Sequence, residues 1–196
     1  MVSKGLTNYI IGDMLGQGNY GVVYSAKHCL TEQEVAIKFE TYGLAPSLLQ
    51  HEARVLLCLK GCPGIPKVLG YGVFGGIKYL IMDRMFDKIS LDTLTTFNKT
   101  LSDVSTELDK LLLNIHRKGF IHRDVKPDNL MFDVSGNVTL IDFGFATNHS
   151  SKQKKRSAKV VGTKTFLGPR GLKGEICPEV DKEGAEKTLE FYRNYL

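Results

Sequence analysis

One stretch of the sequence, HRDVKPDNLMFDVSGNVTLIDFG, contains side chains whose types and spacing could do chemistry. Asp124 is followed by Lys126 and Asn129, and Asp142 opens the DFG triplet after two short strand-like runs. A carboxylate can orient an attacking hydroxyl, a lysine can hold phosphate charge, and carboxylate and amide oxygens can ligate magnesium. These four side chains together therefore suit phosphoryl transfer.

A glycine-rich stretch, GQGNYGVV, lies far upstream and holds Gly16, Gly18 and Gly21 between two strand-like runs. Glycines let a hairpin close over phosphates, because no Cβ blocks the approach of backbone N–H groups. Alone, the pattern fits an ordinary glycine-rich hairpin equally well. A dinucleotide-binding fold would need a helix after the glycines, whereas GVVYSAKHC is typical of a strand, so we exclude that fold.

A lysine and a glutamate follow the glycines. The run VAIK ends in Lys38, which could neutralise phosphate oxygens, and Glu52 lies on an expected helix from which it could hold this lysine in position. Each of the two, taken singly, is more often a solvated charge. Their meaning depends on the elements that carry them.

Those elements divide the chain into a sheet-rich part and a helical part. In the first eighty residues, β-branched and aromatic runs separated by Gly and Asn predict an antiparallel sheet. One helix interrupts it, for which Pro46 suits the first position and Gly61 the residue past the end. Its expected apolar face comprises Leu48, Val55, Leu56 and Leu59.

The second part reads as helical. Thr100 and Asp103 predict a capping box for a helix that ends at Gly119. A terminal helix is expected over 181–196, with Ala185, Leu189, Tyr192 and Leu196 on one stripe.

The composition narrows the class of protein. The 196 residues are 42% hydrophobic and 24% charged, which is typical of one globular domain. No apolar run reaches about 18 residues and the first residues lack the apolar core of a secretion signal, so we expect no membrane partner. The net charge of +5 permits anionic partners, but a nucleic-acid partner is not expected.

The four cysteines predict reduced thiols, because their spacing is irregular and no signal peptide is found. Cys58 and Cys62 lack a second Cys/His pair, so a zinc site is not expected. The predicted location is intracellular, in the cytoplasm, the nucleus or both. No feature of the sequence sets an oligomeric state.

Taken together, GxGxxGxV, VAIK, HRDxKxxN and DFG resemble the motifs of eukaryotic-type protein kinases. Within them the chain most resembles the casein kinase one family, through IGDMLGQGNYGVVYSAKHCLTEQEVAIKFE, GCPGIPKVLGYGVFGG, YLIMD and HRDVKPDNLM. The resemblance covers roughly residues 6–170. It implies an α+β, two-lobed fold in a single kinase domain, 1–196, with an N-lobe at 1–82, a hinge at 83–87 and a shortened helical C-lobe at 88–196.

The resemblance also implies roles for individual residues, with ATP as the phosphate donor and Mg²⁺, or alternatively Mn²⁺, as the metal. Asp124 would be the catalytic base and Lys126 a γ-phosphate contact. Lys38, paired with Glu52, would contact the α- and β-phosphates. Asn129 and Asp142 would bind the metal. The other nucleotide contacts implied are Leu15, Gly16, Gly18, Gly21, Val23, Ala36, Met82, Asp83, Met85 and Met131.

Lys126 and Thr163 resemble the serine/threonine kinases rather than the tyrosine kinases, which implies transfer of the ATP γ-phosphate to serine and threonine hydroxyls of proteins. The segment 150–159 holds five cations and no acid, and predicts a preference for acidic or already phosphorylated protein substrates. A solvated loop or a nuclear-import signal remains an alternative for this segment. The alternative function for the whole chain is an ATP-binding regulatory module with little turnover.

One segment departs from the family's pattern. Gly168-Pro169-Arg170 stands where ordinary kinases have Ala-Pro-Glu. Asp181 resembles the aspartate that opens the long central helix and braces the catalytic loop, but Glu183 and Gly184 replace the usual tryptophan and serine. The late helix that supplies the glutamate's arginine partner is not found, so we expect Arg170 to keep its guanidinium in water and the chain to be a minimal kinase.

Overall fold

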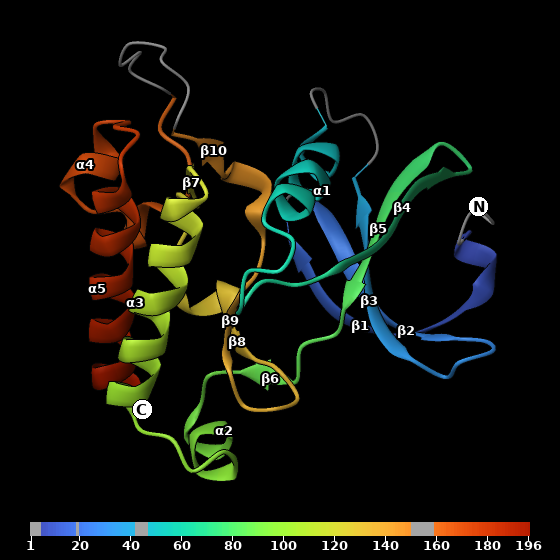
Figure 1. The fold of residues 1–196 in the computed structure, drawn as a ribbon, viewed down its shortest axis with the longest axis horizontal. Helices are drawn as coiled ribbons and strands as arrows, with labels where there is room; N and C mark the ends of the chain where they lie inside the picture. The colour runs from blue at the N-terminus through green and yellow to red at the C-terminus, as the bar shows by residue number, and fades with distance from the viewer. Residues whose placement is uncertain (1–4, 19, 42–46, 150–158) are drawn as a thin grey trace. The chain divides into compact units, whose positions relative to one another are not determined.

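The computed structural model describes residues 5–18, 20–41, 47–149 and 159–196. The chain forms two compact units, Met1–Lys60 with Pro66–Met85, and Gly61–Ile65 with Phe86–Leu196. The expected single kinase domain, 1–196, with an N-lobe that ends at 82 and a C-lobe that begins at 88, stays a prediction. Each unit is described by itself, with the labels of Figure 1.

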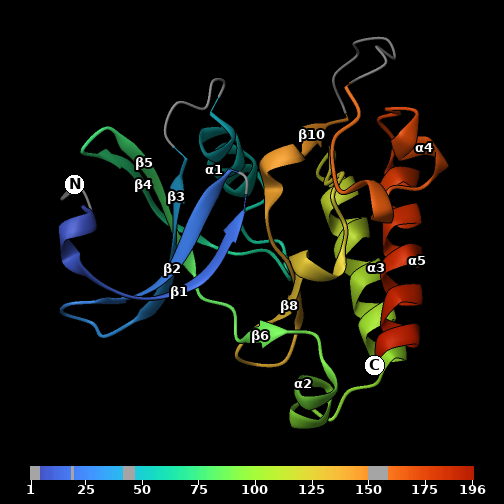
Figure 2. The ribbon, with the colours of Figure 1, turned by 180° about the vertical axis from the view of Figure 1, so that it is seen from behind.

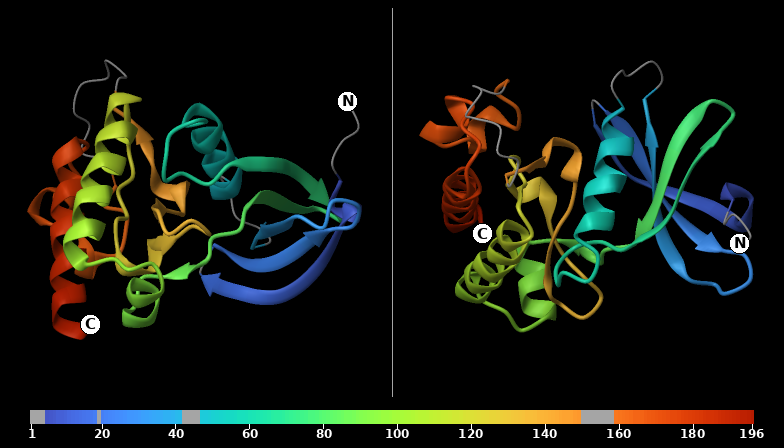
Figure 3. Two further views of the ribbon diagram at one scale, coloured as in Figure 1. Left: turned by 60° about the horizontal axis from the view of Figure 1, so that its bottom comes forward. Right: turned by 45° about the horizontal axis from the view of Figure 1, so that its top comes forward.

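The first unit is built on a five-stranded antiparallel sheet of order β1-β2-β3-β5-β4. A short 3-10 helix, η1 (Leu6–Asn8), precedes it. The strands are β1 (Tyr9–Gly18), β2 (Gly21–His28), β3 (Glu34–Glu40), β4 (Val68–Phe74) and β5 (Ile77–Asp83). Helix α1 (Leu48–Cys58) contacts β3, β4 and β5, and Figure 3 shows it against one face of the sheet.

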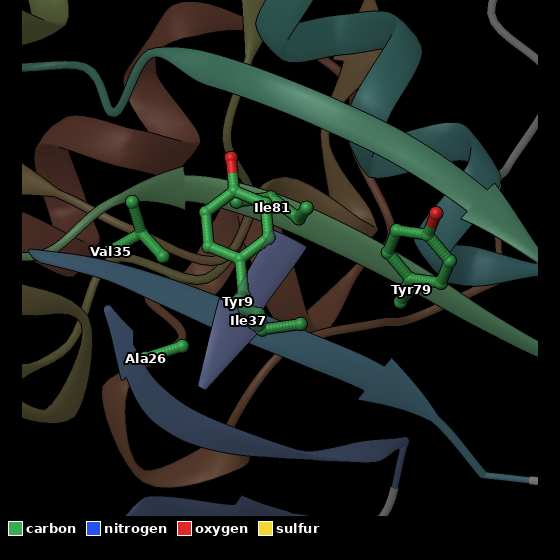
Figure 4. Packing of buried hydrophobic residues seen from close by; sticks show 6 residues of the cluster. All are labelled: Tyr9, Ala26, Val35, Ile37, Tyr79 and Ile81. Carbon is green, nitrogen blue, oxygen red and sulfur yellow. The ribbon is translucent and has the colours of Figure 1, made fainter. Parts of the chain in front are cut away.

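Apolar side chains gather on one face of the sheet, because successive residues of a strand point to opposite faces. On β3, the central strand, Val35 and Ile37 are fully buried, and Ile37 lies opposite Ile81 of β5. Burying such a side chain contributes about 1.5–3 kcal/mol. Figure 4 shows the cluster they form, whose six labelled members are Tyr9, Ala26, Val35, Ile37, Tyr79 and Ile81.

Helix α1 begins later than the sequence predicts. Pro46, expected at its first position, lies outside the described residues. The helix starts at Leu48, because the Ser47 side chain caps it by accepting a hydrogen bond from the Gln50 amide. The buried face includes Leu49, Glu52 and Ala53 as well as the expected Val55 and Leu56.

The second unit combines helices with two small sheets, β6-β8-β9 and β10-β7. Its helices are α2 (Leu91–Thr96), α3 (Leu101–Arg117), α4 (Pro169–Leu172) and α5 (Pro178–Tyr195). Its strands are β6 (Asp87–Lys88), β7 (Phe120–Ile121), β8 (Leu130–Phe132), β9 (Val138–Leu140) and β10 (Thr147–Asn148). Three 3-10 turns complete it, η2 (Pro127–Asn129), η3 (Phe143–Phe145) and η4 (Lys164–Phe166).

Helices α3 and α5 lie side by side, as Figures 1 and 2 both show. The predicted capping box of α3 is confirmed, with Thr100 and Asp103 each binding the other's backbone. Gly119, at φ 81°, follows the end of α3 as expected. Helix α5 begins at Pro178, earlier than the predicted residue 181, because proline's fixed φ suits the first turn of a helix.

The α+β class, with an antiparallel sheet and one helix in the first unit, is confirmed. None of the helices among the described residues is long and apolar enough to span a membrane.

Candidate active site

The residues 122–129, called the HRD loop below, hold three of the predicted site residues close together. The Asp124 carboxylate is buried, and both of its oxygens have partners. The Thr163 amide donates to Oδ1 over 2.7 Å. Lys126 Nζ lies 2.8 Å from Oδ2, and Asn129 Nδ2 lies 3.1 Å from it. These contacts fix the direction of the carboxylate and offset the cost of burying its charge.

Lys126 joins this loop to the segment that carries Thr163. Its ammonium donates to the Thr163 hydroxyl over 2.7 Å as well as pairing with Asp124. An ammonium has three donors, so one remains after these two contacts. The lysine is thus held beside the carboxylate with capacity to bind a phosphate oxygen.

The orientation of the Asn129 side chain follows from its partners. Its amide nitrogen donates to the Asp124 carbonyl over 2.8 Å and to the Asp124 carboxylate. Both partners are acceptors, so the nitrogen must face them, and Oδ1 is the atom that can ligate a cation. An oxygen ligand of this kind suits magnesium.

Asp142 sits at a strained turn that is tied to the HRD loop. Its φ of 63° and ψ of 76° are left-handed, and its carboxylate accepts a hydrogen bond from the Gly144 amide over 3.4 Å. Strain of this kind often marks functional sites. The preceding residue, Ile141, donates its amide to the Asn129 carbonyl over 2.9 Å. The backbone segments of the two predicted metal ligands are therefore hydrogen-bonded to each other.

His122 strengthens the same link. Its Nδ1 accepts from the Asp124 amide over 3.2 Å, so its Nε2 carries the proton that it shares with the Ile141 carbonyl over 3.1 Å. Its ring packs edge-on against Phe143, with centroids 4.7 Å apart. The imidazole therefore serves as a buried connector between the HRD loop and the DFG turn.

Asp181, at the start of α5, contacts the HRD loop in the way the resemblance implies. It is buried, and its two oxygens accept the His122 amide over 2.8 Å and the Arg123 amide over 2.7 Å. His116 of α3 adds its Nε2 at 2.9 Å. These bonds hold Arg123 at a positive φ of 71°.

In the first unit, Lys38 and Glu52 form the ion pair expected of them. Lys38 Nζ on β3 lies 2.7 Å from Glu52 Oε2 on α1. The glutamate side chain is 3% exposed and the lysine 15%. A buried carboxylate of this kind needs its cation, so the pair fixes where the ammonium lies.

The three glycines of the β1–β2 hairpin differ in what surrounds them. A Cβ on Gly21 would lie 2.2 Å from the Phe39 carbonyl oxygen, so packing against β3 excludes any side chain there. A Cβ on Gly16 or Gly18 would meet no described atom within 4 Å. Packing within the described unit therefore accounts for Gly21, whereas no described atom restricts a side chain at Gly16 or Gly18, and their contact with phosphate stays a prediction.

The remaining predicted nucleotide contacts are divided between the units. Ala36 of β3 lies opposite Met82 of β5, and both are buried, whereas Leu15 on β1 is 46% exposed. The Asp83 carboxylate accepts the Lys67 amide over 3.3 Å. Met131 lies on β8 of the second unit, and the first unit also holds Val23, on β2, and Met85.

Arg170 keeps its side chain partly in water, as expected, and it also forms ion pairs that the sequence does not predict. The arginine is half-exposed, but its Nη1 lies 3.1 Å from Glu175 and its Nε 3.5 Å from Glu183 of α5. The Glu183 carboxylate also accepts the Arg170 amide over 3.0 Å. The guanidinium is therefore paired, and its hydrogen bond to Glu175 raises its pKa.

The geometry agrees with what comparisons with known proteins show. The family model described as the protein kinase domain matches residues 9–182. The chain is 29% identical over 153 residues to casein kinase I homolog 3 of Schizosaccharomyces pombe, which covers 72% of this chain and 34% of that protein. The chain thus spans about a third of the length of this curated relative. Protein kinases are phosphotransferases that use ATP and a divalent metal. Because the family model matches most of the sequence, the chain belongs to the protein kinase family.

Proposed function

We propose that the chain is an active serine/threonine protein kinase, similar to casein kinase one, that transfers the γ-phosphate of ATP to hydroxyl groups of proteins. The observation that carries the proposal is the Asp124 carboxylate, held by Lys126, Asn129 and the Thr163 amide. A regulatory module without turnover has no physical need for this set of contacts. We further propose that the two units act as one kinase domain, 1–196, with 83–87 as its hinge.

Each residue of the HRD loop has a defined task in this proposal. Asp124 orients the acceptor hydroxyl and takes its proton at a carboxylate oxygen. Lys126 binds a γ-phosphate oxygen through its remaining donor and offsets negative charge. Asn129 Oδ1 and the Asp142 carboxylate are the oxygen ligands that suit Mg²⁺, with Mn²⁺ as the alternative. When bound, the nucleotide supplies the phosphoryl group, and the metal neutralises part of the phosphate charge.

The first unit binds the nucleotide in this proposal. Gly16 and Gly18 leave room for phosphate oxygens at the hairpin, and Gly21 shapes the hairpin by its close approach to β3. Lys38, fixed by Glu52, contacts the α- and β-phosphates. The adenine contacts proposed are Leu15, Val23, Ala36, Met82, Asp83, Met85 and, from β8, Met131.

The choice of serine and threonine as acceptors is supported by the Lys126–Thr163 hydrogen bond, since this pair is the one that resembles the serine/threonine branch. The proposed preference for acidic or phosphorylated substrates rests on 150–159, of which only Lys159 lies within the described residues. Arg123 contacts this one residue, since its Nη2 donates to the Lys159 carbonyl over 3.0 Å. The free cysteines support activity in a reducing compartment, the cytoplasm or the nucleus.

A transfer assay tests the proposal. The purified chain is incubated with γ-labelled ATP, Mg²⁺ and casein, beside an Asp142→Asn control, and the labelled amino acids are identified after hydrolysis. We expect label on serine and threonine with the parent chain and a loss of at least roughly a hundredfold with the variant, since a metal ligand is removed. Label on tyrosine alone would contradict the acceptor choice, and equal labelling by the two chains would contradict the role of Asp142.

A further inference from the structure

One face of α5 follows the HRD loop along its length. The contacting residues are Asp181, Gly184, Thr188 and Tyr192, whose spacing of three or four places them on a single stripe of the helix. Asp181 binds the amides of His122 and Arg123, as described above. The other three contact the loop further along.

The contacts run in the same order along helix and loop. A Cβ on Gly184 would lie 3.2 Å from the Val125 carbonyl oxygen, so the backbones approach closely there. The Thr188 hydroxyl lies 3.4 Å from the same oxygen and donates to the Gly184 carbonyl over 2.8 Å. The Tyr192 hydroxyl lies 3.3 Å from the Pro127 carbonyl oxygen, to which it donates.

The contact of Tyr192 reaches the turn that carries Asn129. The Pro127 carbonyl also accepts the Leu130 amide, and this bond closes η2, the 3-10 turn Pro127–Asn129. Asn129 in turn donates to Asp124. One carbonyl therefore joins the Tyr192 hydroxyl to the turn that holds a proposed metal ligand.

The hydroxyl of Tyr192 is suited to this task. The side chain is 2% exposed, and burial raises the pKa of its phenol above its usual value, so the group stays protonated and remains a donor. A phenylalanine would fill nearly the same space without bringing a polar group into the interior, where a hydroxyl without a partner is costly. The hydroxyl's observed partner gives it a role beyond packing.

We propose that Tyr192 is a positioning residue, which holds the Pro127 carbonyl and thereby sets the η2 turn so that Asn129 faces the metal. This inference rests on the proposed function, in which Asn129 Oδ1 is a metal ligand. Tyr192 itself touches neither substrate nor nucleotide in this account.

The test compares Tyr192→Phe, which removes only the hydroxyl, with Tyr195→Phe on the same helix, a residue that is 73% exposed. Three quantities are measured on the full chain: steady-state kinetics against ATP and Mg²⁺, thermal unfolding, and amide hydrogen exchange without nucleotide. For Tyr192→Phe we expect kcat to fall and the Mg²⁺ concentration for half-maximal rate to rise, each by about three- to tenfold, the scale of one lost hydrogen bond. The KM for ATP should stay within about twofold, since the nucleotide contacts are unaltered.

Hydrogen exchange gives a readout that does not depend on activity. In Tyr192→Phe, peptides covering 126–130 should exchange faster, while peptides of α3 and the first unit keep the parent rate. Tyr195→Phe should match the parent in every measurement.

Two results would overturn the inference. One is parent kinetics and parent exchange in Tyr192→Phe. The other is faster exchange across the whole second unit together with a lower unfolding temperature and an unchanged Mg²⁺ requirement, which would make the hydroxyl a stabilising group only. If the parent chain transfers no phosphate, the proposed function fails, and the exchange of 126–130 still decides whether Tyr192 holds the turn.

Discussion

The backbone amide of Thr163 donates a hydrogen bond of 2.7 Å to Asp124 Oδ1, while the Thr163 hydroxyl accepts one of the same length from Lys126. Thr163, which follows the DFG turn in the sequence, thus holds both the proposed base and the proposed phosphate-binding lysine. Its amide and its hydroxyl act separately, so substitution can remove one contact and keep the other.

Thr163→Val should lower kcat, because Lys126 loses a hydroxyl partner while the amide bond to Asp124 persists. The expected fall is about three- to tenfold, the scale of one hydrogen bond. Thr163→Ser is the matched control, since it keeps the hydroxyl, and should retain most of the parent rate. Steady-state kinetics with a saturating peptide measure both. A valine variant as active as the serine variant would show that the Lys126–Thr163 bond has no catalytic role.

The glycine hairpin should respond differently at two positions. Gly21→Ala forces a Cβ toward the Phe39 carbonyl oxygen, so it should destabilise the chain by about 1–3 kcal/mol, as overpacking does. Gly18→Ala has room among the described atoms, so its stability should stay within about 1 kcal/mol of the parent.

For nucleotide binding we expect the opposite order of the two variants: once their difference in stability is allowed for, Gly18→Ala should have the larger effect. Gly18→Ala should raise the KM for ATP by roughly three- to tenfold, because a methyl group obstructs a phosphate contact. Denaturant unfolding and ATP titration of both variants check the pair. An unchanged KM in Gly18→Ala would argue for an ordinary hairpin.

Lys38→Met should damage both stability and nucleotide use, because it removes the cation that pairs with the buried Glu52 carboxylate. Removing one partner of a buried ion pair costs on the order of 3 kcal/mol. The double variant Lys38→Met with Glu52→Gln removes both charges and should recover much of the stability but none of the transfer activity. Recovery of activity in the double variant would mean that Lys38 does not contact phosphate.

The ion pairs of Arg170 predict a ranking of stability. Arg170→Glu would place a third carboxylate beside Glu175 and Glu183, whereas Arg170→Gln only removes the cation. The unfolding temperature should therefore decrease from the parent to the glutamine and then to the glutamate variant, with no gain in transfer rate in either. Added salt should narrow the differences by screening. A glutamate variant more stable and more active than the parent would show that a carboxylate at 170 has a partner.

Motifs that depend on local chemistry could be predicted from the sequence. The capping box of α3 needs only Thr100 and Asp103, three residues apart, and the family's spacing of Asp124, Lys126 and Asn129 put these residues in one loop. Contacts that depend on tertiary packing could not be predicted in this way. Nothing local indicates that the Tyr192 hydroxyl reaches Pro127, although the helical spacing of 181, 188 and 192 places them on one face.

The start of α1 and the partners of Arg170 show the same limit. Pro46 and Ser47 both suit a helix start, and the choice was decided by the Ser47 hydroxyl, which accepts from Gln50 and donates to Glu40. The expectation for Arg170 rests on the late-helix arginine that pairs with the glutamate of ordinary kinases, whereas the partners of Arg170, Glu175 and Glu183, come from its own neighbourhood and from α5. The Arg170–Glu183 pair depends on the packing of α5 beside 168–170, which no local pattern of the sequence indicates.

The most direct test of the central claim, that Asp124 acts on the acceptor hydroxyl, is single-turnover phosphate transfer by Asp124→Asn beside direct measurement of ATP affinity. Asparagine has nearly the same shape and can still accept the Thr163 amide, but it cannot take a proton. We predict that ATP binds the variant within about threefold of the parent affinity, since in this account Asp124 acts on the acceptor hydroxyl and not on the nucleotide, while transfer to a serine peptide falls by roughly a hundredfold or more. Transfer by the variant at the parent rate would contradict the account.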